Sequence, residues 1–205
     1  DWADALDEML KLDCELFLPG HGFPIIGKTR IKLALETTSS FLRTIEDQTL
    51  KLMNQGKSLN QVLHEVEIPE NLMNHAWLTP IYDDPQFLIR MIWRRYGGWW
   101  DGEYDRLLPS PRKAEAIAWV ELSGGIENII SKALEQSNQE NYEVAAHLIE
   151  TAFHADHSNE KTHEARSEIY RKFSLKQSSS MGRNILNHAS LASMKGLRDM
   201  AETKN

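Results

Sequence analysis

The sequence predicts a mainly α-helical protein: a multi-helical bundle preceded by a short α/β segment. Two observations support this class. Apolar residues recur at helical spacing from residue 28 to near the end of the chain, and only residues 14–18 have the pattern of a buried strand. One strand cannot make a sheet. Residues 1–27 therefore look like the last piece of a domain that lies mostly elsewhere.

Composition excludes several classes of protein. The 205 residues are 41% apolar and 26% charged, which is typical of a globular protein with a real core. The net charge of −7 gives nucleic-acid binding no electrostatic basis. No apolar run reaches the roughly 18 residues of a membrane span. Cys14 is the only cysteine, so an intrachain disulfide is excluded.

The first 27 residues contain the sharpest candidate for chemistry. Residues 1–12 are patterned as a short amphipathic helix, and the strand at 14–18 is closed by Pro19 and Gly20. His21 follows in a tight Pro-Gly-His-Gly loop, where one imidazole nitrogen could face a metal. The motif is weak by itself, because most loop histidines bind no metal.

A long helix and several short ones follow. Residues 28–55 carry apolar positions at intervals of three, four and seven, with Gly56 as the stop. Such a helix spans roughly 40 Å, more than a small domain needs, and often carries contacts between domains or subunits. Ser58 caps a short helix to residue 66, residues 70–77 form a turn or helix, and Pro85 begins the next helix.

The central stretch at residues 87–102 is rich in aromatic residues. An apolar helix runs into Gly97 and Gly98, which let the backbone bend, and two tryptophans follow. Aromatic side chains so close together either fill a core where the chain turns or form a contact surface. The candidate interface residues are Trp93, Tyr96, Trp99 and Trp100.

The second half is patterned as helix pairs. Helices are expected at residues 112–122, 126–136, 141–154, 161–173 and 181–201. The helix at 112–122 should turn Ala114, Ile117, Ala118 and Leu122 inward. Small alanines between larger residues allow close helix contact. The arrangement is similar to tetratricopeptide (TPR) helix pairs, although only about one repeat is legible.

A second histidine-containing segment lies at the end of the helix at 141–154. His154, Asp156 and His157, with His163 six residues further on, superficially imitate half of a zinc motif. Helix ends and polar loops are also the usual place for solvated His and Asp residues. A metal-binding helical protein built on these four residues is therefore a further hypothesis.

The segments taken together resemble the alkyl sulfatases of the metallo-β-lactamase superfamily. The resemblance starts at residues 18–22, Leu-Pro-Gly-His-Gly, which are similar to the last metal-binding loop of that fold. It continues through residues 49–56, 96–102, 122–125 and 153–159 and ends at Arg183 and Asn184. It covers nearly the whole chain, and the combination is more specific than any single motif. Family members tend to have proline where this chain has His157.

The resemblance implies a division of the chain and a function. Residues 1–27 would be the C-terminal remnant of a metallo-β-lactamase-like domain, and residues 28–205 a helical alkyl-sulfatase-type dimerisation domain. The parent would be a zinc-dependent, homodimeric hydrolase of sulfate esters, in which His21 completes a binuclear zinc site with ligands upstream of Asp1. The 205-residue chain alone should then be inactive, because a hydrolytic zinc needs about three protein ligands.

The alternative is a free-standing TPR-like helical adaptor that binds a protein partner. The two hypotheses differ in the expected state of residues 1–27. A detached or disordered segment favours the fragment of a larger enzyme, whereas a segment that packs as an integral part favours the adaptor.

Overall fold

The computed structural model describes residues 1–195, which form two compact units. The first unit comprises residues 1–80 and 84–107, and the second comprises residues 81–83 together with the chain from residue 108 onward. Ten α-helices and one two-stranded sheet make up the described part, so the mainly α fold class is confirmed. None of the helices in residues 1–195 combines the length and apolar character needed to cross a membrane.

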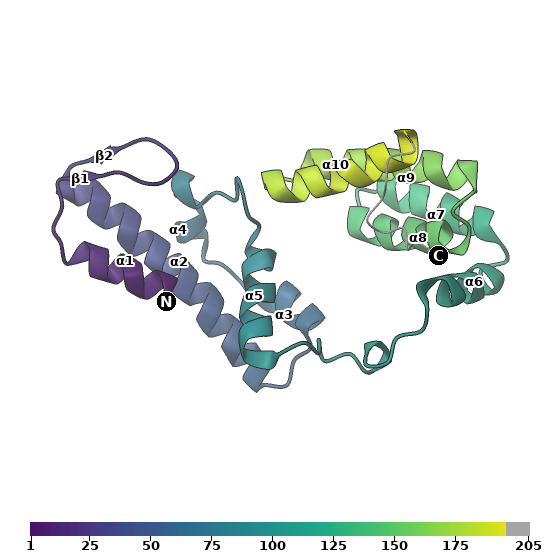
Figure 1. Ribbon diagram of the computed structural model, residues 1–205, viewed down its shortest axis with the longest axis horizontal. Helices are drawn as coiled ribbons and strands as arrows, with labels where there is room; N and C mark the ends of the chain where they lie inside the picture. The colour runs from purple at the N-terminus through teal and green to yellow at the C-terminus, as the bar shows by residue number, and fades with distance from the viewer. Residues whose placement is uncertain (196–205) are drawn as a thin grey trace. The chain divides into compact units, whose positions relative to one another are not determined.

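The first unit is organised along one long helix, α2 (Lys28–Asn54), as the spacing predicted. Helix α1 (Trp2–Leu10) lies beside α2, with Leu6 packed against Ile31 and Leu35 (Figure 1). The Arg43 guanidinium on α2 donates hydrogen bonds to Asp4 at 2.8 Å and to Asp7 at 2.5 Å. Residues 1–27 are therefore packed and hydrogen-bonded onto the long helix, which is the outcome expected of a self-contained adaptor.

A small antiparallel hairpin joins α1 to α2. Strand β1 (Leu16–Phe17) pairs with β2 (Ile25–Ile26), so that Leu16 lies opposite Ile26. The expectation of one buried strand at residues 14–18 is wrong in two respects. The strand has a partner that the sequence pattern did not reveal, and Leu16, Leu18 and Ile26 are exposed. An isolated two-stranded ribbon pairs its backbone but buries little side-chain surface.

The core of the first unit lies between α2 and the short helices that follow it. Helix α3 (Leu59–Glu65) is capped by a reciprocal pair of hydrogen bonds between Ser58 and Gln61. It is followed by α4 (Glu70–Met73), the 3-10 turn η1 (Ala76–Leu78) and α5 (Pro85–Gly97). Large apolar side chains from these elements form the core: Phe41, Ile45, Val62, Leu63, Leu72, Leu78, Ile89 and Trp93.

The turn after α5 is fixed against the start of α3. The Leu59 amide donates to the Asp101 carbonyl at 2.8 Å. Gly102 has a φ of +86°, and a Cβ there would lie 3.0 Å from the Ser58 Cα. A side chain at this position would meet both backbone strain and a clash. The turn continues into the 3-10 segment η2 (Tyr104–Arg106).

The second unit is a stack of helices. Its elements are α6 (Arg112–Leu122), α7 (Ile126–Asn138), α8 (Tyr142–Ala155), α9 (Glu160–Lys176) and α10 (Ser180–Lys195). Isoleucines and alanines alternate in its core: Ile129, Ile130, Ala133, Ala145, Ile149, Ala152, Ala165 and Ile169. Residues 81–83 belong to this unit because the amides of Ser180 and Met181 donate to the carbonyls of Ile81 and Tyr82. The part of the last predicted helix beyond residue 195 lies outside the described residues.

Helix α6 corrects one sequence expectation. The predicted inward positions Ala114, Ile117, Ala118 and Leu122 are all exposed, and the side that packs on the unit carries buried Ala116 and half-buried Val120. Seven of its eleven residues are apolar. Periodicity alone therefore could not identify the buried side.

The boundary between residues 27 and 28 does not coincide with a break in packing, because α1, the hairpin and α2 share one compact unit. A division at this point stays a prediction about a longer parent protein.

Candidate functional site

His21 lies in the loop of the hairpin, and its side chain is exposed. Gly22 beside it has a φ of +100°, which makes the turn tight, as the Pro-Gly-His-Gly sequence predicted. The loop also exposes large apolar side chains, above all Phe23, which is 91% exposed. The position of His21 at the tip of a structured loop is therefore confirmed, and its role as a ligand stays a prediction.

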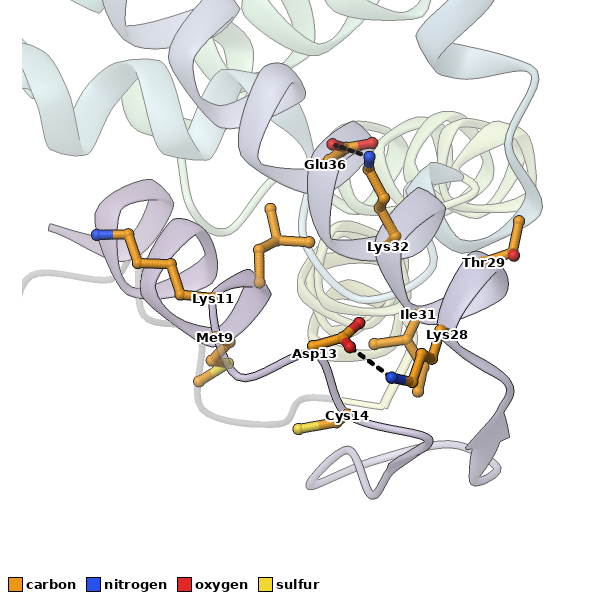
Figure 2. A pocket seen from close by; sticks show the side chains of 10 residues that line it. Met9, Lys11, Asp13, Cys14, Lys28, Thr29, Ile31, Lys32 and Glu36 are labelled. Carbon is orange, nitrogen blue, oxygen red and sulfur yellow. Dashed lines mark hydrogen bonds and ion pairs between the residues drawn. The ribbon is translucent and has the colours of Figure 1, made fainter.

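A hollow of about 650 Å³ lies between the end of α1 and the start of α2 (Figure 2). Three lysines line it, and each is paired with a carboxylate: Lys28 with Asp13, Lys32 with Glu36 at 3.7 Å, and Lys11 with Glu8 at 2.5 Å. His21 is not among the residues that line the hollow. Because its cations are neutralised within the chain, the hollow has no unmatched charge for a ligand.

The side chains of residues 1–195 do not by themselves form a zinc site. Among residues 1–195, no group of three or more His, Cys, Asp and Glu side chains is placed to hold a metal. Zinc sites use three or four converging protein ligands. His21 could therefore be one ligand of such a site only with partners from outside residues 1–195.

The four candidate interface aromatics divide between the core and the surface. Trp93 is only 8% exposed, and its Nε1 donates to the Trp100 carbonyl at 2.9 Å. Trp100 is half-buried and donates to the Glu103 carbonyl at 3.2 Å. Trp99 is 77% exposed, and Tyr96 is about half exposed. The core-filling alternative thus describes Trp93, whereas Trp99 and Tyr96 remain accessible to a partner.

Tyr96 borders a smaller hollow of about 310 Å³ inside the first unit. Its hydroxyl donates to Glu46 at 2.9 Å, and this hydrogen bond raises the pKa of the phenol. Exposed Trp2 and Met91 also line the hollow, and Arg95 at its rim pairs with Asp1 at 3.1 Å. The hollow offers apolar contact surface rather than reactive groups.

The histidine-containing segment after α8 is not a ligand set. The Asp156 carboxylate accepts hydrogen bonds from the amide and hydroxyl of Ser158, and these bonds lower its pKa. His154 lies 3.6 Å from Glu150 rather than beside Asp156. His157 stacks on the buried Phe153 ring at 4.4 Å, and His163 meets the edge of the same ring. The imidazoles pack around an aromatic ring instead of converging on a point, which argues against the metal hypothesis.

Sequence reasoning missed a polar pair beside Phe153, formed by Arg166 and Glu150. Arg166 is 2% exposed, and its guanidinium lies over the Phe153 ring at 4.2 Å. It donates from Nε to Glu150 at 2.6 Å and from a terminal nitrogen to the Ala189 carbonyl at 3.1 Å. One signal could have revealed it, because Arg166 stands among the apolar positions of α9, next to Ala165 and one turn before Ile169 and Tyr170.

Comparison with known proteins identifies the family. The alkyl sulfatase dimerisation family matches residues 58–196, more than half of the chain and parts of both units. The chain belongs to this family. A linear primary-alkylsulfatase from Pseudomonas sp. (strain ATCC 19151) is 25% identical over 172 residues, which are 83% of this chain and 33% of that protein. The alkyl/aryl-sulfatase BDS1 of Saccharomyces cerevisiae is 24% identical over 89% of this chain and 29% of its own length.

Solved structures show the same fold. The stereoselective inverting sec-alkylsulfatase Pisa1 from Pseudomonas sp. matches 96% of this dimerisation-family chain with a TM-score of 0.90 and 21% sequence identity, over 32% of its own length. Its double mutant S233Y F250G gives the same TM-score. The chain thus spans about a third of the relatives it matches.

Proposed function

We propose that this chain is the assembly part of a larger alkyl-sulfatase-like hydrolase, and that it associates into a homodimer. The observation that carries the proposal is the match to the alkyl sulfatase dimerisation family across residues 58–196. The exposed aromatic and apolar side chains of both units supply contact surface of the kind that interfaces use.

The packing of α1 onto α2 is the outcome expected of the adaptor alternative. The relatives favour the assembly part. They match 83–90% of this chain, and all four are alkylsulfatases or alkyl/aryl-sulfatases about three times its length. A free-standing adaptor would have no reason to match enzymes over nearly its whole length.

Under this proposal, hydrolysis of sulfate esters belongs to the parent protein and its metallo-β-lactamase-like domain. His21 would contribute one imidazole to a zinc site whose other ligands lie outside this chain. The exposed apolar residues of the hairpin, such as Phe23, would be covered by that domain. Residues 1–205 alone should then neither bind zinc stoichiometrically nor hydrolyse an alkyl sulfate.

Sedimentation velocity of the purified chain, from about 1 to 100 μM, tests the assembly part of the proposal. We expect a concentration-dependent shift from monomer to dimer. A single monomeric species over the whole range would refute self-association.

The catalytic part is tested separately by zinc titration calorimetry and by sulfate release from a linear alkyl sulfate with added zinc. We expect neither a stoichiometric zinc site nor turnover, with or without His21→Ala. Turnover by the pure chain would show that the active centre is contained in it.

A further inference from the structure

Helix α6 presents an apolar face that no described residue of the second unit covers. The side opposite its buried Ala116 carries Ala114, Ala118 and Leu122, and Leu122 is 78% exposed. Exposed Ile117 borders this side. The sequence pattern predicted that this face would be buried in the core. Helix α6 therefore has apolar residues on two sides, and only the side with Ala116 is buried in the second unit.

The exposed face consists of two neighbouring rows along the helix. One row is Lys113, Ile117 and Glu121, and the other is Ala114, Ala118 and Leu122; each row steps by four residues and so runs up one side of the helix. Each row is roughly 12 Å long. The first row has opposite charges at its two ends, and the second has a small residue at one end and a large one at the other.

These charges are placed unfavourably for an isolated helix. Lys113 lies in the first turn and Glu121 in the last, the reverse of what the helix dipole favours. Within the described residues, neither side chain makes an ion pair or a side-chain hydrogen bond. Lys113 does lie close enough to Asp156 for its positive charge to help lower the pKa of that carboxyl, so Glu121 is the less compensated of the two charges. A second helix running in the opposite direction would place a carboxylate beside Lys113 and an ammonium beside Glu121.

We propose that the α6 face packs antiparallel against α6 of a second copy of this chain, across a two-fold axis near Ile117 and Ala118. Such an axis sets each row beside its own reversed copy. Lys113 of one copy then faces Glu121 of the other, twice per dimer, and Leu122 faces the small Ala114. The alanines allow the two helices to approach closely. This inference rests on the proposed homodimer and names the surface that forms it.

A pair of three-turn helices buries less than the roughly 800 Å² per partner of a typical stable interface. Helix α6 is therefore the centre of a larger contact. Changes in it should weaken the dimer measurably without abolishing every contact.

Charge reversal tests the pairing directly, because the two positions face each other across the axis. Lys113→Glu alone sets like charges together twice, and so does Glu121→Lys. Each should raise the dimer dissociation constant about tenfold or more. Mixing the two variants restores both opposite-charge pairs in a heterodimer, so the mixture should associate about as tightly as wild type. Both substitutions place charges that suit the helix dipole. Lys113→Glu also brings a carboxylate toward Asp156, so Glu121→Lys is the variant whose weaker dimer is least open to an effect on the monomer.

Two further variants complete the experiment. Ala118→Glu puts like charges at the axis and should weaken the dimer with no rescue on mixing. Glu164→Lys makes the same charge change as Glu121→Lys at an exposed position of α9 and should leave association unchanged. Sedimentation velocity gives the dissociation constants, and circular dichroism confirms that each variant is folded.

The outcomes separate this inference from the proposed function. If wild type dimerises and the reversals have no effect, or the mixture stays as weak as its components, the α6 pairing is wrong and the assembly role stands. If wild type is a monomer throughout, both fail.

Discussion

The two units of the chain build their cores in different ways. In the first unit, short helices bring large side chains such as Leu63 and Trp93 against Phe41 on one side of α2. In the second, stacked helices of similar length meet through alternating isoleucine and alanine, with Ala133, Ala145 and Ala152 fully buried. Bulky residues fill irregular space between unequal elements, whereas alanine lets regular helices approach closely.

The two units also differ in the polar groups that they bury. The first unit buries hydroxyl groups such as those of Ser39 and Thr49, while the second also buries the guanidinium of Arg166. The first unit should therefore be most sensitive to loss of side-chain volume. The second should be most sensitive to added volume and to loss of the Arg166 partner.

The largest effect is expected from Trp93→Ala in the first unit. The substitution empties the core and removes the hydrogen bond to the Trp100 carbonyl, so it should lower the free energy of unfolding by about 3–5 kcal/mol. Urea unfolding followed by circular dichroism measures it. Trp99→Ala is the matched control, because the Trp99 side chain is largely in solvent and its removal should change little. Equal effects of the two substitutions would remove the distinction between core and surface tryptophans.

Glu150→Gln should have the next largest effect and should act on the second unit. It removes the charge that accepts the 2.6 Å hydrogen bond from buried Arg166 while keeping the shape, at a cost of about 1.5–3 kcal/mol. The same change at Glu127 is the control. Glu127 pairs with Lys161 at 2.9 Å, but both side chains are exposed, so its loss should be within error.

Ala152→Leu tests the close approach of helices in the second unit. Ala152 is fully buried between helices, so three extra carbons should force them apart and cost about 1–3 kcal/mol. Ala5→Leu introduces the same side chain on the exposed side of α1 and should be neutral. A neutral Ala152→Leu would mean that the second core has room to spare, contrary to the comparison.

Much of this fold could be predicted from short-range signals. The cap at Ser58, the start at Pro85 and the extent of the long helix follow from local backbone chemistry, and the structure confirms all three. The β1–β2 pairing was missed because two-residue strands leave no alternation to detect. The buried side of α6 was mistaken because apolar residues surround most of that helix.

The candidate sites also differ in how far they could be predicted from residues nearby in the sequence. The loop position of His21 follows from its neighbours in sequence, and the structure confirms it. Residues distant in sequence determine which tryptophans are buried and what the histidines at the end of α8 contact. Trp93 meets the α2 core and His157 stacks on Phe153, and no local pattern distinguishes these positions from Trp99 or from a ligand set.

The smallest expected effect is a pH dependence that belongs to the second unit. Burial lowers the pKa of the His154 imidazole below its ordinary value of 6.5; Glu150 opposes this shift, and Arg112, His157 and Arg166 add to it. The unfolded chain therefore takes up a proton at a higher pH than the folded chain does. Stability is complete above pH 6.5 and falls as the pH drops toward the lower folded pKa.

His154→Gln should remove this part of the pH dependence. Between pH 7.5 and 5.5, the wild-type free energy of unfolding should fall by more than that of the variant. His147→Gln, at an exposed position of the same helix, should follow wild type. If His154→Gln kept the full dependence, the loss of stability in acid would have to come from other groups, and the imidazole would be a packing element alone. The unequal chemistry of the two units would then reduce to Arg166 and the alanine-lined helix contacts.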